Sequence, residues 1–365
     1  MSSEPLVLVA AGGTGGHLFP AQALSHALVA RGARVRLATD ERALKYGGDF
    51  PAEAIHEIAS ATPTSGGLAA KARAALTLGK GVFEAYGLLG RIKPRVVVAF
   101  GGYPTVPPAL AASLRGIPLV LHEQNAVMGR ANRFLARRAK IIACGFPTLD
   151  GLPDGLRDRV AQVGNPVRPA VLEAAGLAYP DFADGRLRLL VTGGSQGARI
   201  MSDVVPAAVG LLAPEQRARL VIVQQARGED LVRVEEAYRR LGVAFEAAPF
   251  FADLPLRMAQ SHLVLGRSGA STVSELAVIG RPSILVPFPH ALDADQAANA
   301  AHLAKTAAAE VMRQTGFTPE WLAERLAQAL ADPKDLTRRA QAAKSAGIPD
   351  AAERLADLAL RIAGL

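Results

Sequence analysis

The chain has 365 residues, of which 50% are hydrophobic, 20% charged and 5% aromatic; this length favours two domains, and this composition excludes a mainly disordered chain. The net charge of +8 predicts attraction to phosphates, nucleic acid or anionic lipid headgroups, but five Tyr and one Trp are few for base stacking, so nucleic acid is the weakest of the three. The single cysteine, Cys144, excludes an internal disulfide and is expected to be a buried, unreactive thiol.

No targeting or membrane-spanning segment is recognisable in the sequence. Residues 1–5 lack the basic segment and apolar stretch of a signal peptide, and no run of about 18 uninterrupted apolar residues occurs. We therefore expect a cytoplasmic chain that touches a membrane only from its surface.

Short apolar runs alternate with stretches of helical period along the whole chain. This pattern is typical of β-α units that build parallel sheets, so the predicted fold class is α/β. The expected strands are Leu6–Ala11, Val35–Thr39, Val96–Phe100, Leu119–His122, Ile141–Cys144, Leu187–Thr192, Leu220–Gln224, Val243–Ala247, Leu263–Gly266, Ser283–Pro287 and Ala309–Met312. The expected helices include Pro20–Arg31, Asp230–Leu241, Ser271–Ile279, Gln296–Thr306 and Pro349–Ile362.

An approximate internal repeat indicates two domains of one architecture. An apolar strand runs into the glycine-rich loop Gly12–His17, and another runs into Gly193–Gly197, 181 positions later (193 minus 12). The prolines and Asn165 within Val160–Pro169 place the boundary there.

Glycine clusters follow four of the predicted strands. They are Gly12–Gly16, Gly101–Gly102, Gly193–Gly197 and Gly266–Gly269. Glycine at a strand end lets backbone N–H groups approach a phosphate at a helix N-terminus, so we expect at least one cluster to bind phosphate.

The main rival ligand for the first loop is a dinucleotide cofactor, with Asp40 as the ribose-binding acid. Against it, a G-x-G-x-x-G fingerprint starting at Gly13 meets Leu18 where the last glycine should stand. No glycine-rich loop carries the Walker lysine either, so phosphoryl transfer from ATP is not expected.

His17 closes the first glycine-rich loop at a predicted helix start. The functional interpretation is a neutral imidazole that acts as general base on a sugar hydroxyl, or that orients it. The alternative is a histidine that merely hydrogen-bonds the loop.

Polar residues also cluster at two other strand ends. His122-Glu123-Gln124-Asn125 follows an apolar strand, and Glu123 and Asn125 are expected to point the same way; the alternative is a turn satisfied by its own side chains. Glu275 follows Ser268–Ser274 at a helix start, where it either completes a capping box with Ser271 or Thr272 or binds ribose hydroxyls.

Two further features have weaker predictions. Asp293-Ala294-Asp295 resembles an acidic metal-binding pair but precedes a helix, so we interpret it as a helix start, and no metal site or cofactor is expected. Residues 68–93 mix apolar side chains with Lys and Arg, which fits either a core helix or a surface that lies on anionic lipid.

Together these motifs resemble the MurG family, the inverting N-acetylglucosaminyltransferases of peptidoglycan synthesis. The resemblance covers nearly the whole chain, and its motifs are specific because of their order and spacing. They are Gly12–His17 with Pro20, Gly101–Tyr103, His122–Asn125, Gly164–Arg168, Gly193–Arg199, Arg267–Glu275, and Gln296 with Asn299.

The resemblance implies two Rossmann-like domains facing a cleft, the GT-B glycosyltransferase architecture. Residues 1–163 would form the acceptor and membrane-associated domain, 164–345 the UDP-N-acetylglucosamine domain, and 346–365 a helix that crosses back to the first domain. The acceptor would be lipid I, the undecaprenyl-pyrophosphoryl muramoyl pentapeptide, at the cytoplasmic face of the inner membrane. An anionic membrane surface and proteins of the cell-wall and division machinery would be partners.

The resemblance also implies site residues. His17 is the first choice for catalytic base, with Glu123 and Asn125 in reserve, and Glu275 would bind the ribose. Other donor contacts would be Thr14, Gly15, Gly16, Asn125, Arg168, Ser195, Gln196, Ala270, Ser271, Thr272, Val273, Ser274 and Gln296, with a backbone contact from Phe251 to the uracil.

One stretch departs from the family's pattern. Gln224–Gly228 stands where many relatives carry His-Gln, then Thr or Ser, then Gly, so no donor contact is carried over to it. A nicotinamide-dependent dehydrogenase and a non-catalytic sugar-nucleotide or lipid-headgroup binding protein stay as alternative functions.

Overall fold

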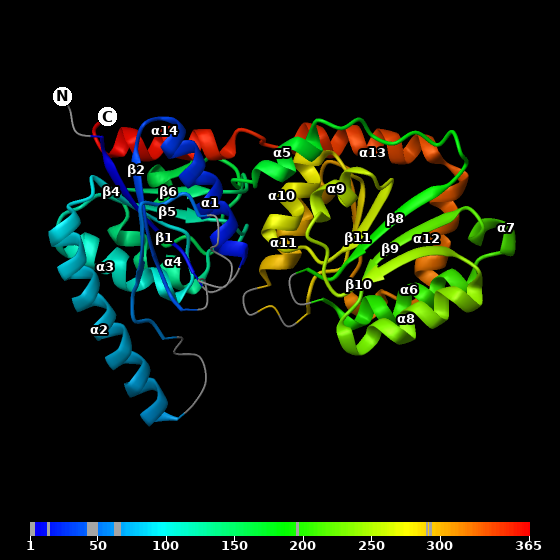
Figure 1. Cartoon of the computed structure of the whole chain (residues 1–365), viewed down its shortest axis with the longest axis horizontal. Coiled ribbons are helices and arrows are strands. Elements are labelled where there is room, and N and C mark those ends of the chain that lie inside the picture. The colour runs from blue at the N-terminus through cyan, green and yellow to red at the C-terminus, as the bar shows by residue number, and fades with distance from the viewer. Residues whose placement is uncertain are drawn as a thin grey trace. The chain divides into compact units, whose positions relative to one another are not determined.

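The computed structural model describes residues 4–12, 15–41, 50–61, 67–194, 197–289, 291 and 294–365. The chain forms two compact units, one of residues 1–168 with 349–365 and the other of residues 169–348. Figure 1 shows a sheet with helices around it in each unit.

The first unit is built on a seven-stranded parallel sheet in the order β3-β2-β1-β4-β5-β6-β7. Its strands are β1 (Leu6–Ala10), β2 (Arg34–Thr39), β3 (Ala54–Glu57), β4 (Val96–Ala99), β5 (Leu119–Glu123), β6 (Ile141–Cys144) and β7 (Val160–Gln162). Its helices are α1 (Gly15–Ala30), α2 (Leu68–Ile92), α3 (Val106–Leu114), α4 (Arg130–Leu135) and α14 (Ala351–Ile362), with 3-10 turns η2 (Tyr103–Thr105), η3 (Ala136–Arg138) and η4 (Arg157–Arg159).

Alternation along β1 explains how the first sheet is covered on both faces. Val7 and Val9 face one core with residues of α1 and α14, whereas Leu8 and Ala10 face another core with residues of α2, α3 and α4. The C-terminal helix α14 packs on α1 in this unit (Figure 1), which confirms that it crosses back to the first domain.

The second unit repeats the arrangement with a six-stranded parallel sheet in the order β10-β9-β8-β11-β12-β13. Its strands are β8 (Leu187–Thr192), β9 (Leu220–Gln225), β10 (Ala244–Ala248), β11 (Leu263–Gly266), β12 (Ser283–Leu285) and β13 (Ala309–Val311). Its helices are α5 (Pro169–Ala175), α6 (Arg199–Leu211), α7 (Pro214–Arg217), α8 (Gly228–Leu241), α9 (Leu254–Ala259), α10 (Ala270–Ile279), α11 (Asp295–Ala304), α12 (Pro319–Ala331) and α13 (Pro333–Ala346), with the 3-10 turn η5 (Gln314–Gly316).

These sheets confirm the predicted α/β class and every predicted strand, with ends that shift by one or two residues. The strands β3 and β7, at the two edges of the first sheet, were not predicted from the sequence. Both are short and partly exposed and include polar residues, so neither contains a continuous apolar run.

Strand order places the four glycine clusters at the two switch points. The clusters follow β1 and β4 in the first sheet and β8 and β11 in the second, and each pair of strands is adjacent. In a doubly wound sheet the order in which successive strands are added reverses at these central strands, which leaves a crevice at their carboxyl ends where ligands bind.

Candidate functional site

The glycine-rich loop after β1 packs too closely for larger residues. A Cβ on Gly12 would lie 2.9 Å from Pro104 Cβ and 3.1 Å from Asp40 Oδ1, and one on Gly15 would lie 2.8 Å from the Phe19 ring. The first turn of α1, which includes Gly16, contains no acidic residue. This start of a helix therefore suits an anion, which its amide hydrogens and dipole attract.

His17 lies in the first turn of α1, beside the second glycine turn. A Cβ on Gly102 would lie 3.6 Å from His17 Cε1 and 3.7 Å from its Nδ1, and the φ of Gly102 is +76°, which favours glycine. Desolvation by the surrounding protein lowers the pKa of His17 from 6.5 to about 4. The imidazole is therefore neutral at pH 7, the form that a general base requires.

His122 connects the end of β5 to the segment that leaves the first unit. Its Nε2 lies 3.0 Å from the carbonyl oxygen of Gly164, and its Nδ1 lies 3.0 Å from Nε2 of Gln124. Asn165 Nδ2 donates to the carbonyl oxygen of Gln124 at 2.9 Å. These bonds fix the backbone just before Arg168.

Glu123 has a supporting position, which argues against a role as a base. Its buried carboxylate accepts hydrogen bonds from the backbone N–H groups of Asn125 and Gly129, both at 3.0 Å, and from Asn132 Nδ2 at 2.8 Å. Asn132 in turn lies against Gly101, whose Cβ would be 3.1 Å from Nδ2. Glu123 and Asn125 thus bind each other, and the carboxylate shapes the loop that carries Asn125.

Arg168 lies at the end of the first unit, near the first glycine-rich loop. Its guanidinium carbon is 4.4 Å from the centroid of the Phe19 ring, and Phe19 is the residue against which Gly15 packs. This cation-π contact places a fixed positive charge beside the start of α1.

In the second unit, Gln225 organises the loop after β8. Its Oε1 accepts hydrogen bonds from Thr192 Oγ1 at 3.0 Å and from the backbone N–H of Gly193 at 3.1 Å, and its Nε2 donates to the carbonyl oxygen of Pro249 at 3.2 Å. Gly193 must be glycine, because a Cβ there would lie 2.1 Å from the backbone nitrogen of Ala198. This role of Gln225 was not predicted from the sequence, where its only signal is its place at the end of a strand.

The start of α10 contradicts the capping-box alternative for Glu275. The N-cap residue is Gly269, which has no side-chain cap, and Ser271 and Thr272 lie inside the first helical turn. A capping box on this helix would need its acidic partner at Thr272, the third helical residue, whereas Glu275 lies further along the helix. Glu275 is buried within this unit, which leaves the ribose interpretation as the functional alternative.

Gln296, at the start of α11, is held beside the loop after β11. Its Oε1 accepts a hydrogen bond from the backbone N–H of Phe288 at 2.9 Å, and its carbonyl oxygen accepts one from Ser268 Oγ at 2.8 Å. Asn299 Nδ2 donates to the carbonyl oxygen of Ser268 at 3.3 Å. The family motifs around Arg267 and Gln296 are thus in direct contact.

The remaining predicted donor contacts stay predictions. Phe251 is buried, with the guanidinium carbon of Arg257 4.3 Å from its ring centroid, and Ala270–Ser274 form the start of α10. Five residues named above from the sequence lie outside the described residues, namely Gly13, Thr14, Ser195, Gln196 and Asp293.

Metal and thiol chemistry were also considered in the sequence analysis. Across the described ranges, no group of three or more His, Cys, Asp and Glu side chains is arranged to hold a metal ion. Cys144 is buried, and desolvation raises the pKa of its thiol to about 11, which confirms an unreactive thiol.

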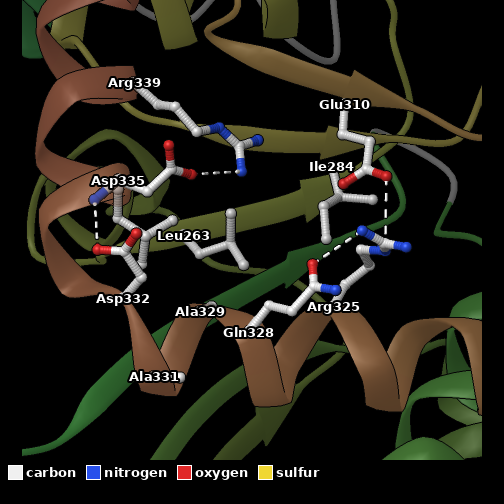
Figure 2. Close-up of a pocket in the computed structure, with 11 residues that line it drawn as sticks. Leu263, Ile284, Glu310, Arg325, Gln328, Ala329, Ala331, Asp332, Asp335 and Arg339 are labelled. Atoms are coloured by element: carbon white, nitrogen blue, oxygen red, sulfur yellow. Dashed lines mark hydrogen bonds and ion pairs between the residues drawn. The ribbon is translucent and has the colours of Figure 1, made fainter.

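A cavity of about 360 Å³ lies elsewhere in the second unit, lined by residues of β11, β12, β13, α12 and α13 (Figure 2). Its polar side chains bond to one another: Arg325 is 2.8 Å from Gln328 Oε1 and 3.6 Å from Glu310, and Arg339 is 3.9 Å from Asp335. Leu263 lines it and begins β11, whereas the glycine cluster follows the other end of that strand. This cavity is therefore separate from the glycine clusters that follow β8 and β11.

Comparison with known proteins places both halves in one family. Residues 7–144 match the glycosyltransferase family 28 N-terminal domain, and residues 188–355 match the glycosyltransferase family 28 C-terminal domain. A relative from Methylorubrum extorquens, named UDP-N-acetylglucosamine-N-acetylmuramyl-(pentapeptide) pyrophosphoryl-undecaprenol N-acetylglucosamine transferase, is 59% identical over 97% of this chain and 96% of its own length. A relative of the same name from a Bradyrhizobium species is 54% identical over the full length of both chains.

Solved structures agree with this match. The crystal structure of Acinetobacter baumannii MurG superposes with a TM-score of 0.79 at 29% identity, over 98% of this chain and 99% of that one. A UDP-GlcNAc 2-epimerase from Neisseria meningitidis, at 15% identity and a TM-score of 0.68 over 98% of this chain and 100% of that one, shares the fold. Among the described residues, no helix is both long and apolar enough to cross a membrane.

Proposed function

Because the chain belongs to glycosyltransferase family 28, and within it to the MurG family, we propose that it transfers N-acetylglucosamine from UDP-N-acetylglucosamine to lipid I. The product is lipid II, the disaccharide-pentapeptide precursor of peptidoglycan. The observation that carries this proposal is 59% identity over 97% of the chain to a relative of that name. The nicotinamide-dependent alternative is not favoured, because both halves match glycosyltransferase domains.

The reaction is a single in-line displacement. The C4 hydroxyl of the muramoyl sugar attacks C1 of the donor sugar, the bond from C1 to the diphosphate oxygen breaks, and UDP leaves with the electron pair from the opposite face. The configuration at C1 therefore inverts, and the new linkage is β. The hydroxyl proton passes to a base, for which we propose His17, whose neutral imidazole at pH 7 can accept it.

The first unit holds the acceptor and the second holds the donor. In the second unit, the starts of α6 and α10, neither of which has a side-chain cap, present backbone N–H groups to the departing diphosphate. Arg168 adds positive charge, Glu275 binds the ribose hydroxyls and Gln296 contacts the sugar nucleotide. In the first unit, Glu123 holds the loop that carries Asn125.

The protein works as a peripheral enzyme on the cytoplasmic face of the inner membrane, and α2 makes the contact. Leu76 and Phe83 are 75% and 81% exposed, and with Arg73 and Lys80 they follow the i, i+3, i+7 spacing of one helical face. An exposed stripe that alternates apolar and cationic side chains suits an anionic lipid surface.

The rest of α2 is anchored to the unit. Gly81 approaches the backbone so closely that a Cβ would lie 1.9 Å from the carbonyl oxygen of Ala59, and Glu84 Oε2 accepts a hydrogen bond from the Ala59 N–H at 3.1 Å. Figure 1 shows the other end of α2 extending past the sheet of the first unit. The helix can therefore present its stripe without rearrangement.

The decisive experiment combines purified protein, labelled UDP-N-acetylglucosamine and a lipid-linked muramoyl acceptor. We expect transfer of label to the acceptor and release of UDP, with a β linkage in the product. Donor binding without transfer would favour the non-catalytic alternative, and stabilisation by NAD rather than UDP in a thermal-shift assay would favour the dehydrogenase.

Membrane contact is tested separately by co-sedimentation with vesicles. Phe83→Ser and Leu76→Ser should reduce binding to vesicles that contain phosphatidylglycerol, whereas Val232→Ser, which alters an exposed apolar residue of α8, should not. If all three variants bound the vesicles as well as the wild-type protein does, α2 would not make the membrane contact.

A further inference from the structure

Arg227 is the N-cap residue of α8 and follows β9. Its side chain packs against Gly197, at the end of the glycine cluster that follows β8. A Cβ on Gly197 would be 2.9 Å from Arg227 Cγ, so the aliphatic part of the arginine packs directly on this glycine. Its Nη2 donates to the carbonyl oxygen of Gly197 at 3.3 Å. Arg227 lies in the stretch that departs from the family's pattern, Gln224–Gly228, so the resemblance implies no role for it.

The loop beneath Arg227 is itself suited to a phosphate. It leads into α6, a 13-residue helix whose N-cap residue, Ala198, provides no side-chain cap and whose first turn contains no acidic residue. The N–H groups of Gly193 and Gly194 are bound to Gln225 and Thr192, which holds these two glycines in place. The positive end of the α6 dipole and the Arg227 guanidinium therefore lie at the same loop.

Charge pairing around the loop differs between Arg227 and Arg233. Arg233 Nη2 lies 2.8 Å from Asp203 and 2.7 Å from Asp230, so it compensates both carboxylates. A carboxylate beside Arg227 is that of Glu229, at 3.8 Å and 70% exposed on its side chain. Such a long, exposed pair contributes little free energy, so phosphate oxygens can replace it at low cost.

We propose that Arg227 contacts the diphosphate of the bound UDP-sugar and stabilises the charge that develops on it as UDP leaves. This inference rests on the proposed function. When the bond from C1 to the β-phosphate oxygen breaks, its electron pair stays on that oxygen and adds one negative charge to the diphosphate. A guanidinium donates two parallel N–H bonds to such a group, so the contact strengthens as the bond breaks.

The test compares inhibition by UDP, UMP and uridine across matched variants. Arg227→Met keeps most of the aliphatic packing on Gly197 and removes the charge, Arg227→Lys keeps a charge without the planar fork, and Arg240→Met removes a charge from the far end of the same helix. For Arg227→Met we expect UDP inhibition to weaken about tenfold or more, as for loss of a charge-assisted hydrogen bond, with UMP affected less and uridine unchanged. Arg227→Lys should be intermediate, and Arg240→Met should match the wild type.

Two results would overturn the inference. Unchanged UDP inhibition in Arg227→Met would show that the guanidinium does not reach the diphosphate. Equal weakening for UDP and uridine would show that Arg227 only supports the loop. A wild-type protein that neither binds UDP nor transfers sugar would instead refute the proposed function, so the two failures are distinguishable; circular dichroism and the melting temperature verify that each variant folds.

Discussion

The imidazole Nε2 of His122 donates a hydrogen bond to the carbonyl oxygen of Gly164, 42 residues further along the chain, at 3.0 Å. A carbonyl oxygen can only accept, so Nε2 carries the proton and Nδ1 accepts from the Gln124 amide at 3.0 Å. Both ring nitrogens are thus used by the neutral tautomer. Burial lowers the pKa of His122 to about 4, in agreement with this arrangement.

His122 should make stability depend on pH below neutrality. Its pKa is about 6.5 when unfolded and about 4 when folded, so the unfolded state binds more protons between these values. The stabilisation is fully present above about pH 6.5 and is lost as the pH falls toward 4, by up to roughly 3 kcal/mol. Denaturant unfolding at pH 7.5, 6 and 5 measures it.

Two variants are needed to assign this pH dependence to His122, because burial also lowers the pKa of His17. In His122→Gln, the decrease in the free energy of unfolding between pH 7.5 and 5 should be smaller by the contribution of His122. In His17→Gln, the decrease should be smaller only by the contribution of His17. An identical pH slope in wild type and His122→Gln would contradict a neutral, doubly bonded ring.

Replacement of His17 by Ala should lower turnover by about 10² to 10⁴ with little change in UDP affinity, as for loss of a general base. Because the pKa of His17 is about 4, the acid limb of kcat/KM that belongs to it should lie well below pH 6.5. Steady-state kinetics with saturating donor and a UDP-binding isotherm measure the two effects. Unchanged turnover would exclude His17 from the chemistry.

Glu123→Gln should reduce stability and turnover without removing the acid limb of the pH profile. The amide replaces one acceptor oxygen of a buried group that receives N–H bonds from Asn125, Gly129 and Asn132, which leaves a donor facing a donor at a cost of about 1 to 3 kcal/mol. Asn132→Ala should reproduce a milder form of the defect. If Glu123→Gln removed the limb while the melting temperature held, Glu123 would be the base.

Glu275→Ala should weaken binding of UDP-N-acetylglucosamine by about tenfold, as for loss of a charged hydrogen-bond partner. Ser271→Ala serves as the stability control. Since the N-cap of α10 is Gly269, this substitution removes no cap and should leave the melting temperature nearly unchanged. Normal donor affinity in Glu275→Ala would exclude the ribose contact.

The edge strands and Glu123 show where sequence reasoning loses information. Apolar runs predicted every strand of the two sheets except β3 and β7, because most strands are buried on both faces and carry a continuous apolar signal in their own residues. The short, partly exposed strands β3 and β7 leave no such signal. Glu123 was placed correctly at a strand end, but the partners that make it a supporting group lie up to nine residues away and within a different element, α4.

The sequence by itself determined the fold class, the positions of the glycine turns and the family. The first two depend on local properties, namely short apolar runs and the backbone freedom of glycine, and the family depends on the order and spacing of the motifs. Only the tertiary structure decided the tautomer of His122, the supporting role of Glu123 and the contact of Arg227 with Gly197. Burial and hydrogen-bond partners determine these properties, and the fold brings those partners together from positions far apart in the chain.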